Sequence, residues 1–173
     1  MKTIFQATAK YNRSVNQSIM ELIRPLSKEQ VMMKTKAYYP SIFETLLHNL
    51  IADINWMRRY KEVFQGNKAL NNDRLLSLEE KGLRKEFEAD YTAFYRYRGE
   101  VDDLIVQFAN EIDESKLPSV MKYKTYKGEV MEKEVWKTLL HLFNHQTHHR
   151  GQVSVLLDLV GVDHDFSSVT TRI

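Results

Sequence analysis

The chain has 173 residues, of which 43% are hydrophobic and 28% charged, and its formal net charge is +2. A chain of this length commonly forms one domain, so we expect a single domain over residues 1–173. The apolar fraction excludes an intrinsically disordered protein, and the near-neutral charge gives no support to a dedicated nucleic-acid or membrane-surface role. The sequence contains no cysteine, which excludes disulfides, thiolate metal ligands and cysteine nucleophiles.

Two features of the sequence favour the cytoplasm. The first residues, MKTIFQATAKYNRS, lack the apolar core of a signal peptide. The longest apolar stretch, residues 153–162, is too short to span a bilayer and carries Asp158. Because the absence of cysteine also fits a reducing compartment, we expect a soluble cytoplasmic protein with no membrane partner.

Glycine and proline are scarce, with six and three residues respectively. No two glycines are close enough to form a phosphate-binding loop, and neither GxGxxG nor GxxxxGK[ST] is present. Nucleotide-binding α/β folds therefore have no support, whereas long apolar periodicity indicates helices.

Residues typical of helix ends set the limits of the first two predicted helices. The first is predicted over about residues 3–24, stopping before Pro25. Its apolar residues recur at steps of three, four and seven: Ile4, Tyr11, Val15, Ile19 and Leu22. The second is predicted to begin at Ser41, which forms a capping box with Glu44, and to end at Gly66.

A third helix is predicted to begin at Ser77, in another capping box with Glu80. Its apolar stripe continues to Ile112, and Gly99 within it favours a kink or break there.

The only β-like passage comes next. Residues 120–126 and 130–134 alternate Tyr, Thr and Val with charged residues around Lys127-Gly128, which predicts a short hairpin. A fourth helix follows over about residues 135–160 and ends at Gly161. The expected fold is all-α, an antiparallel four-helix bundle with a short β-hairpin before the last helix.

The last helix concentrates four of the six histidines, His141, His145, His148 and His149. Neutral imidazole is a common ligand of zinc, nickel and iron, and residues four apart stand on one helix face. His145 can therefore share an ion with His149 or, by spacing alone, with His141. On a helical wheel His149 and His145 lie nearest the apolar arc, so they form the inward pair. The alternative is a set of surface histidines on a His-rich helix.

His48 lies on the second helix, away from its apolar stripe. Its neighbours on the helix face are small and polar: Ser41, Glu44, Thr45, Ala52 and Asn55. This strip is either the solvated face of the helix or the lining of a polar cavity inside the bundle, and spacing does not decide between them.

Three more specific functional motifs are excluded. HQTHH is similar to the HExxH of zinc proteases, but Gln146 stands where the glutamate base must be. A di-iron bundle needs Glu-x-x-His on two helices, whereas Glu44 stands four residues before His48 and no second pair exists. There is no G-x-S-x-G, so a nucleophilic hydrolase has no obvious nucleophile.

Together these motifs resemble a known family. FNHQTHHRGQVSVLL (143–157) is similar to the HxxxHRGQ signature of the DinB/YfiT-like metal-binding four-helix bundles. YNRSVNQSIMELI (11–23) and LLHNLIADINWMRRY (46–60) are similar to the first two helices of that family, and the hairpin also matches. The resemblance covers most of the chain.

The resemblance implies one divalent ion, zinc or nickel, held by His48, His145 and His149. Three ligands leave a coordination position open, as in catalytic sites. The better understood relatives transfer low-molecular-weight thiols, so the resemblance implies a metal-dependent thiol S-transferase or hydrolase that uses such a thiol and an electrophilic small molecule. It identifies no catalytic side chain, and it implies a homodimer. The alternative is a non-enzymatic metal-binding or stress-associated interaction protein, which needs the same bundle and ligands.

Several neighbouring residues receive supporting roles. Arg150 is expected to pair with a carboxylate on another helix, Gly151 to permit close helix approach, and Gln152 to orient a ligand imidazole. Asn12 and Asn16 either point into the cavity or join helices by hydrogen bonds.

Aromatic residues suggest two further interpretations. Trp56 is expected in the core rather than against a substrate. YTAFYRYR (91–98) interleaves aromatic and basic residues, as strand-binding proteins do. Acidic neighbours cancel that charge and the aromatics continue the helical stripe, so we expect no nucleic-acid partner.

Overall fold

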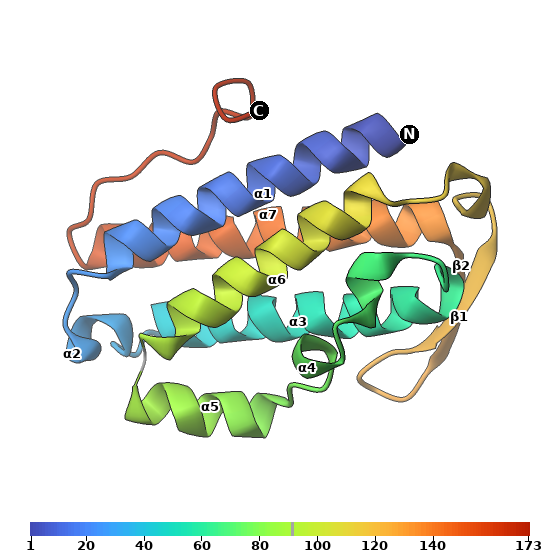
Figure 1. Ribbon diagram of the computed structural model, residues 1–173. Coiled ribbons are helices and arrows are strands. Elements are labelled where there is room, and N and C mark those ends of the chain that lie inside the picture. The colour runs from blue at the N-terminus through green and yellow to red at the C-terminus, as the bar shows by residue number, and fades with distance from the viewer. Residues whose placement is uncertain (91) are drawn as a thin grey trace.

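The computed structural model describes residues 1–90 and 92–173. Four long helices form a bundle, and the chain also contains shorter helices and one hairpin (Figure 1). The long helices are α1 (Lys2–Ile23), α3 (Ile42–Val63), α6 (Ala93–Asn110) and α7 (Val135–Leu159). The shorter elements are α2 (Lys28–Val31), α4 (Asp73–Leu76), α5 (Glu80–Ala89), the 3₁₀ turns Lys68–Asn71 and Glu114–Lys116, β1 (Val120–Lys124) and β2 (Val130–Glu134). The predicted all-α bundle with a hairpin before its last helix is confirmed.

The bundle is built from two antiparallel pairs. Helix α1 packs along α6, and α3 packs along α7. Helices α4 and α5 carry the chain back along the outside, so α6 starts at the same end of the bundle as α3 (Figure 1). The α3–α7 pair brings together the two segments that carry the candidate ligands.

Helix α3 begins as predicted but ends early. The Ser41 hydroxyl accepts a hydrogen bond from the Glu44 N–H at 3.2 Å, which is half of the capping box. The other half is absent because the Glu44 carboxylate receives two hydrogen bonds from Arg84 of α5 instead. The helix stops at Val63 rather than at Gly66.

The prediction for the third helix is wrong at its start and at its break. Ser77 ends α4, where its N–H donates to the Asp73 carbonyl, and a separate helix, α5, begins at Glu80. The chain turns after Asp90, whose carboxylate accepts from the N–H and hydroxyl of Thr92. This local turn chemistry separates α5 from α6, and Tyr91 lies outside the described residues. Gly99 lies within the continuous helix α6.

The hairpin and the end of α7 agree with the sequence prediction. Strands β1 and β2 pair antiparallel, with Met121 opposite Lys133, although β1 ends at Lys124 rather than at residue 126. Gly128 in the turn has φ 83° and Gly161 after α7 has φ 76°, conformations that favour glycine.

The core lies between the four long helices. Its largest fully buried side chains include Leu47, Leu50, Ile54, Tyr60 and Phe108. Ile4, predicted on the apolar face of the first helix, is 67% exposed because it lies on the outer side of α1. Phe5 and Ala9 are the residues buried on the inner side of this segment. No described helix combines the length and apolar character needed to cross a membrane.

Candidate metal centre

Three histidines from two helices meet at the surface of the bundle. Because α3 and α7 run antiparallel side by side, His48 faces His145 and His149. The Nε2 atom of His145 lies 3.2 Å from that of His48 and 3.1 Å from that of His149. Within the described residues, these are the only three His, Asp or Glu side chains that gather closely enough to share an ion.

The outer nitrogens of two rings are held by neighbours. The Nδ1–H of His149 donates to Gln152 Oε1 at 2.7 Å. The Nδ1 of His48 lies 2.8 Å from the Tyr39 hydroxyl, and the two rings stack at 4.2 Å between centroids. Such contacts fix the orientation of an imidazole and leave its Nε2 toward the centre.

The donor set fits a divalent cation. Two nitrogens bound to one tetrahedral zinc ion at about 2.0–2.1 Å lie about 3.3 Å apart, which is close to both separations in the triad. With Nδ1 protonated, the Nε2 of His149 carries a lone pair, and His145 can donate to only one of its two neighbours. At least one nitrogen lone pair therefore remains unmatched, and a cation would satisfy it. The Nδ1 of His145 is buried and has no hydrogen-bond partner among the described residues.

The environment keeps these imidazoles neutral, which is the form that binds metals. Partial burial, followed by the nearby His149, lowers the pKa of His48 to about 4. The same causes, with His48 and His141 added, lower the pKa of His145 to about 3. Burial also lowers the pKa of His149. At neutral pH the three imidazoles are therefore in the form that can bind a metal.

The remaining histidines of α7 lie outside the triad. His141 and His148 are exposed, and His149 is buried, in the order that the helical wheel predicts. Trp56 is 5% exposed and stacks on Tyr60, which confirms its place in the core.

Of the predicted supporting residues, Gln152 is placed to orient a ligand and two others are not placed as expected. Arg150 donates to Gln146 Oε1 and Thr147 Oγ1 of its own helix, not to a carboxylate of another helix. The reason is that Gln146 lies between Arg150 and the nearest buried acid, Asp53. Gly151 is exposed, and a Cβ there would meet open space, so it serves no close helix approach.

A buried charged network lies directly beneath the triad. Arg98 of α6 donates to Asp53 of α3 at 2.8 Å and binds Asp102 with two hydrogen bonds. Gln146, the neighbour of His145, donates to Asp53 at 3.0 Å, and Asn16 donates to Asp102 at 2.9 Å. Asn16 therefore joins helices, whereas the buried Asn12 has no side-chain partner among the described residues.

Sequence reasoning missed two parts of this region. Tyr39 lies in the loop before α3, where no periodicity marks a residue as functional. Asp53 carried a usable signal, since it is a charged residue beside the apolar stripe of α3.

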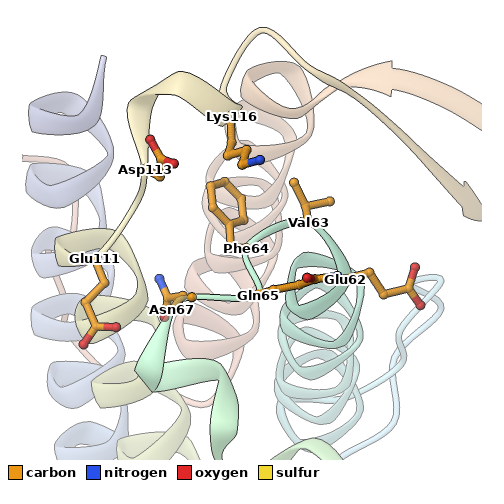
Figure 2. Close-up of a pocket in the computed structure, with 9 residues that line it drawn as sticks. Glu62, Val63, Phe64, Gln65, Asn67, Glu111, Asp113 and Lys116 are labelled. Atoms are coloured by element: carbon orange, nitrogen blue, oxygen red, sulfur yellow. The ribbon is translucent and has the colours of Figure 1, made fainter.

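A sizeable cavity lies away from the triad. It has a volume of about 500 Å³ and lies at the opposite end of α3 from His48, beside the turn that contains Phe64 (Figure 2). Glu62 and Glu111 lie on opposite sides of it, and Glu111 accepts hydrogen bonds from the N–H groups of Lys68 and Ala69. Because these acids do not converge, the chemistry of the donors favours the triad over this cavity as a metal site.

Comparisons with known proteins agree with this geometry. The family model described as the DinB family matches residues 1–167. The protein DinB of Bacillus subtilis (strain 168) is 28% identical over 153 residues, which cover 87% of this chain and 83% of that protein. No solved structure gives a significant match. The family match spans nearly the whole chain, including all three histidines of the triad, and this protein belongs to the DinB family.

Proposed function

We propose that this protein is a metal-dependent enzyme that joins a low-molecular-weight thiol, through its sulfur, to an electrophilic small molecule. His48, His145 and His149 would hold one zinc or nickel ion. The observation that carries the proposal is the convergence of three neutral Nε2 atoms, two of them on rings oriented by other side chains. Such an ion supplies a Lewis acid, which lowers the pKa of a bound thiol and keeps the sulfur as a nucleophilic thiolate.

The chain's own residues prepare this chemistry. Three neutral ligands leave the positive charge of a divalent ion uncompensated, which favours an anionic sulfur over a neutral one. In the transfer itself the thiol releases its proton to solvent, its sulfur forms a bond to the electrophilic carbon, and the leaving group departs with the bonding electrons.

Tyr39 and Gln152 limit the motion of the ligands. Tyr39 stacks on His48 and also makes an edge contact with His149 at 5.4 Å between centroids. A fixed ligand set keeps its geometry while substrates enter and leave, so these contacts support catalysis as well as affinity.

The test combines metal content with turnover. The zinc-loaded and nickel-loaded proteins are incubated with a small thiol and a panel of alkyl and aryl electrophiles, and loss of free thiol is followed. We expect thiol consumption by the wild type and by His148→Ala, and none by His145→Ala. A metal-loaded wild type that consumes no thiol with any electrophile would contradict the enzyme proposal and favour a non-enzymatic metal-binding protein.

A further inference from the structure

One cationic side chain on the same face of α3 as His48 has no anionic partner among the described residues. Arg59 lies on α3, eleven residues after His48, which is about three helical turns and places both on one face within about 20°. Its guanidinium is half-buried, and no carboxylate of the described residues lies within ion-pair distance of it. The other cations of this helix segment, Arg58 and Lys61, both pair with acids.

Aromatic rings hold the guanidinium in place. It lies over the rings of Trp56 and Tyr123, at 4.6 and 5.0 Å from their centroids, and those two rings contact each other. One of its N–H groups donates to the Lys124 carbonyl at 2.9 Å. A guanidinium has five N–H donors, so most of them remain available to a ligand. The cation is thus fixed by its stacking partners while its hydrogen-bonding capacity is largely unused.

A continuous run of rings connects this cation with the metal centre. Trp56 contacts the exposed His141 at 5.4 Å between centroids, and His141 contacts His145 at 5.8 Å. Neither contact involves Tyr39, whose ring lies against His48 and His149 instead. A ligand whose sulfur lies at the triad can therefore extend along the exposed His141 toward Arg59.

We propose that Arg59, assisted by the exposed imidazole of His141, binds a carboxylate of the thiol substrate and thereby selects acidic thiols. This inference rests on the proposed thiol chemistry at the triad. Arginine suits the role because its planar fork binds a carboxylate with two parallel hydrogen bonds. Partial desolvation strengthens such a pair, and burial lowers the pKa of Arg59 without a carboxylate nearby to offset it.

The test measures thiol binding rather than turnover. The cobalt(II)-loaded protein is titrated with mercaptopropionate, mercaptohexanoate and mercaptooctanoate and with the mercapto-alcohols of the same chain lengths. Binding is read from the thiolate-to-cobalt charge-transfer absorption. For the longer chains we expect the acid to bind about tenfold more tightly than the alcohol, as one charge-assisted pair allows.

Substitutions separate recognition from packing. In Arg59→Gln the advantage of the longer acids over the alcohols should disappear, while the alcohols bind as to the wild type. Lys61→Gln, on the same helix and with the same change of charge, should keep the advantage. Arg59→Lys retains the charge but loses the fork, and it should retain part of the advantage, which provides a second variant if Arg59→Gln does not fold.

The outcomes distinguish the inference from the function on which it rests. Suppose that the mercapto-alcohols bind the cobalt-loaded protein. If the wild type then binds acid and alcohol with nearly equal affinity, or if Arg59→Gln keeps the wild-type ratio of the two affinities, the role of Arg59 is overturned and the thiol chemistry stands. If no thiol alters the cobalt spectrum, the proposed function fails and the role of Arg59 fails with it.

Discussion

The candidate metal centre on α3 and α7 and the buried network that joins α3 to α6 have opposite electrostatics. Asp53, Arg98 and Asp102 pair opposite charges in the interior, and each is less than 4% exposed. His48, His145 and His149 bring three like bases together with no acid among them. The first arrangement satisfies its own charges, whereas the second gathers nitrogen lone pairs that can bind a cation. One region therefore stabilises the fold, and the other is prepared for a ligand.

The largest expected effect comes from breaking the buried network. Arg98→Met would leave two buried carboxylates without their cation, and loss of one partner of a buried pair costs about 3–5 kcal/mol. Chemical denaturation should show this loss in the free energy of unfolding. Arg96→Met is the matched control, since the ion pair of Arg96 with Glu86 and its contact with the Tyr97 ring lie at the surface and their loss should cost at most about 1 kcal/mol. Equal effects of the two substitutions would contradict a structural role for the network.

The triad should respond in the opposite way to truncation. His145→Ala removes the nitrogen that faces both other ligands, so the metal-free protein should be no less stable than the wild type. The gain in stability from metal should vanish. For the wild type that gain is about 2.7 kcal/mol when free zinc is at a hundred times Kd. Thermal unfolding with and without zinc measures both quantities. A metal-free His145→Ala protein with a strongly lowered Tm would instead indicate a structural triad.

The pH dependence of the two regions should also have opposite signs. The folded pKa of His145 is about 3 and that of His48 about 4, below the usual value for histidine, so the unfolded chain binds more protons in the range between. The stability from neutral histidines is therefore present above about pH 6.5 and lost as the pH falls toward about 4. For Asp102, burial raises the pKa to about 6, so its contribution is present below about pH 4 and lost as the pH rises through about 6.

The contribution of the histidines is isolated by comparing the stability of the metal-free wild type with that of metal-free His145→Ala. The free energy of unfolding of the metal-free wild type, minus that of metal-free His145→Ala, should decrease as the pH falls from about 6.5 to about 4. Asp102 is present in both proteins, so its opposite contribution cancels. A difference that stays constant across this range would contradict neutral, desolvated ligands.

The smallest expected effect concerns the residues that orient the ligands. Tyr39→Phe removes the hydroxyl beside His48 Nδ1 but keeps the stacked ring, and Gln152→Leu removes the acceptor of His149 Nδ1–H. Each should weaken metal binding by about tenfold, without a comparable change in metal-free stability. Competition with a chelator of known affinity measures this change. Unchanged metal affinity in both variants would show that the contacts do not position the ligands.

Residue patterns predicted the fold better than the site. Periodicity and glycine placed α7 and the hairpin, because both depend on local preferences. The break at Asp90 was missed, since a turn formed by one side chain leaves no periodic signal, whereas Gly99 looked like a break and is not one.

For the site, local pattern reached the two histidines of α7 but not His48. The helical wheel favoured His145 and His149, and it left His48 on a strip with two interpretations. Only the resemblance to the family selected His48, because its place depends on how α3 packs against α7. Tyr39 and the pairing of Asp53 with Arg98 depend on the same long-range packing, which single-helix periodicity does not contain.

The central claim is that His48, His145 and His149 bind one divalent ion, and elemental analysis tests it most directly. The tag-free wild type, His48→Ala, His149→Ala and the control His148→Ala are purified, supplied with zinc or nickel and freed of excess metal. We predict close to one ion per chain in the wild type and in His148→Ala, and almost none in the other two variants. A wild type that retains no metal, or triad variants that retain as much as the wild type, would contradict the claim.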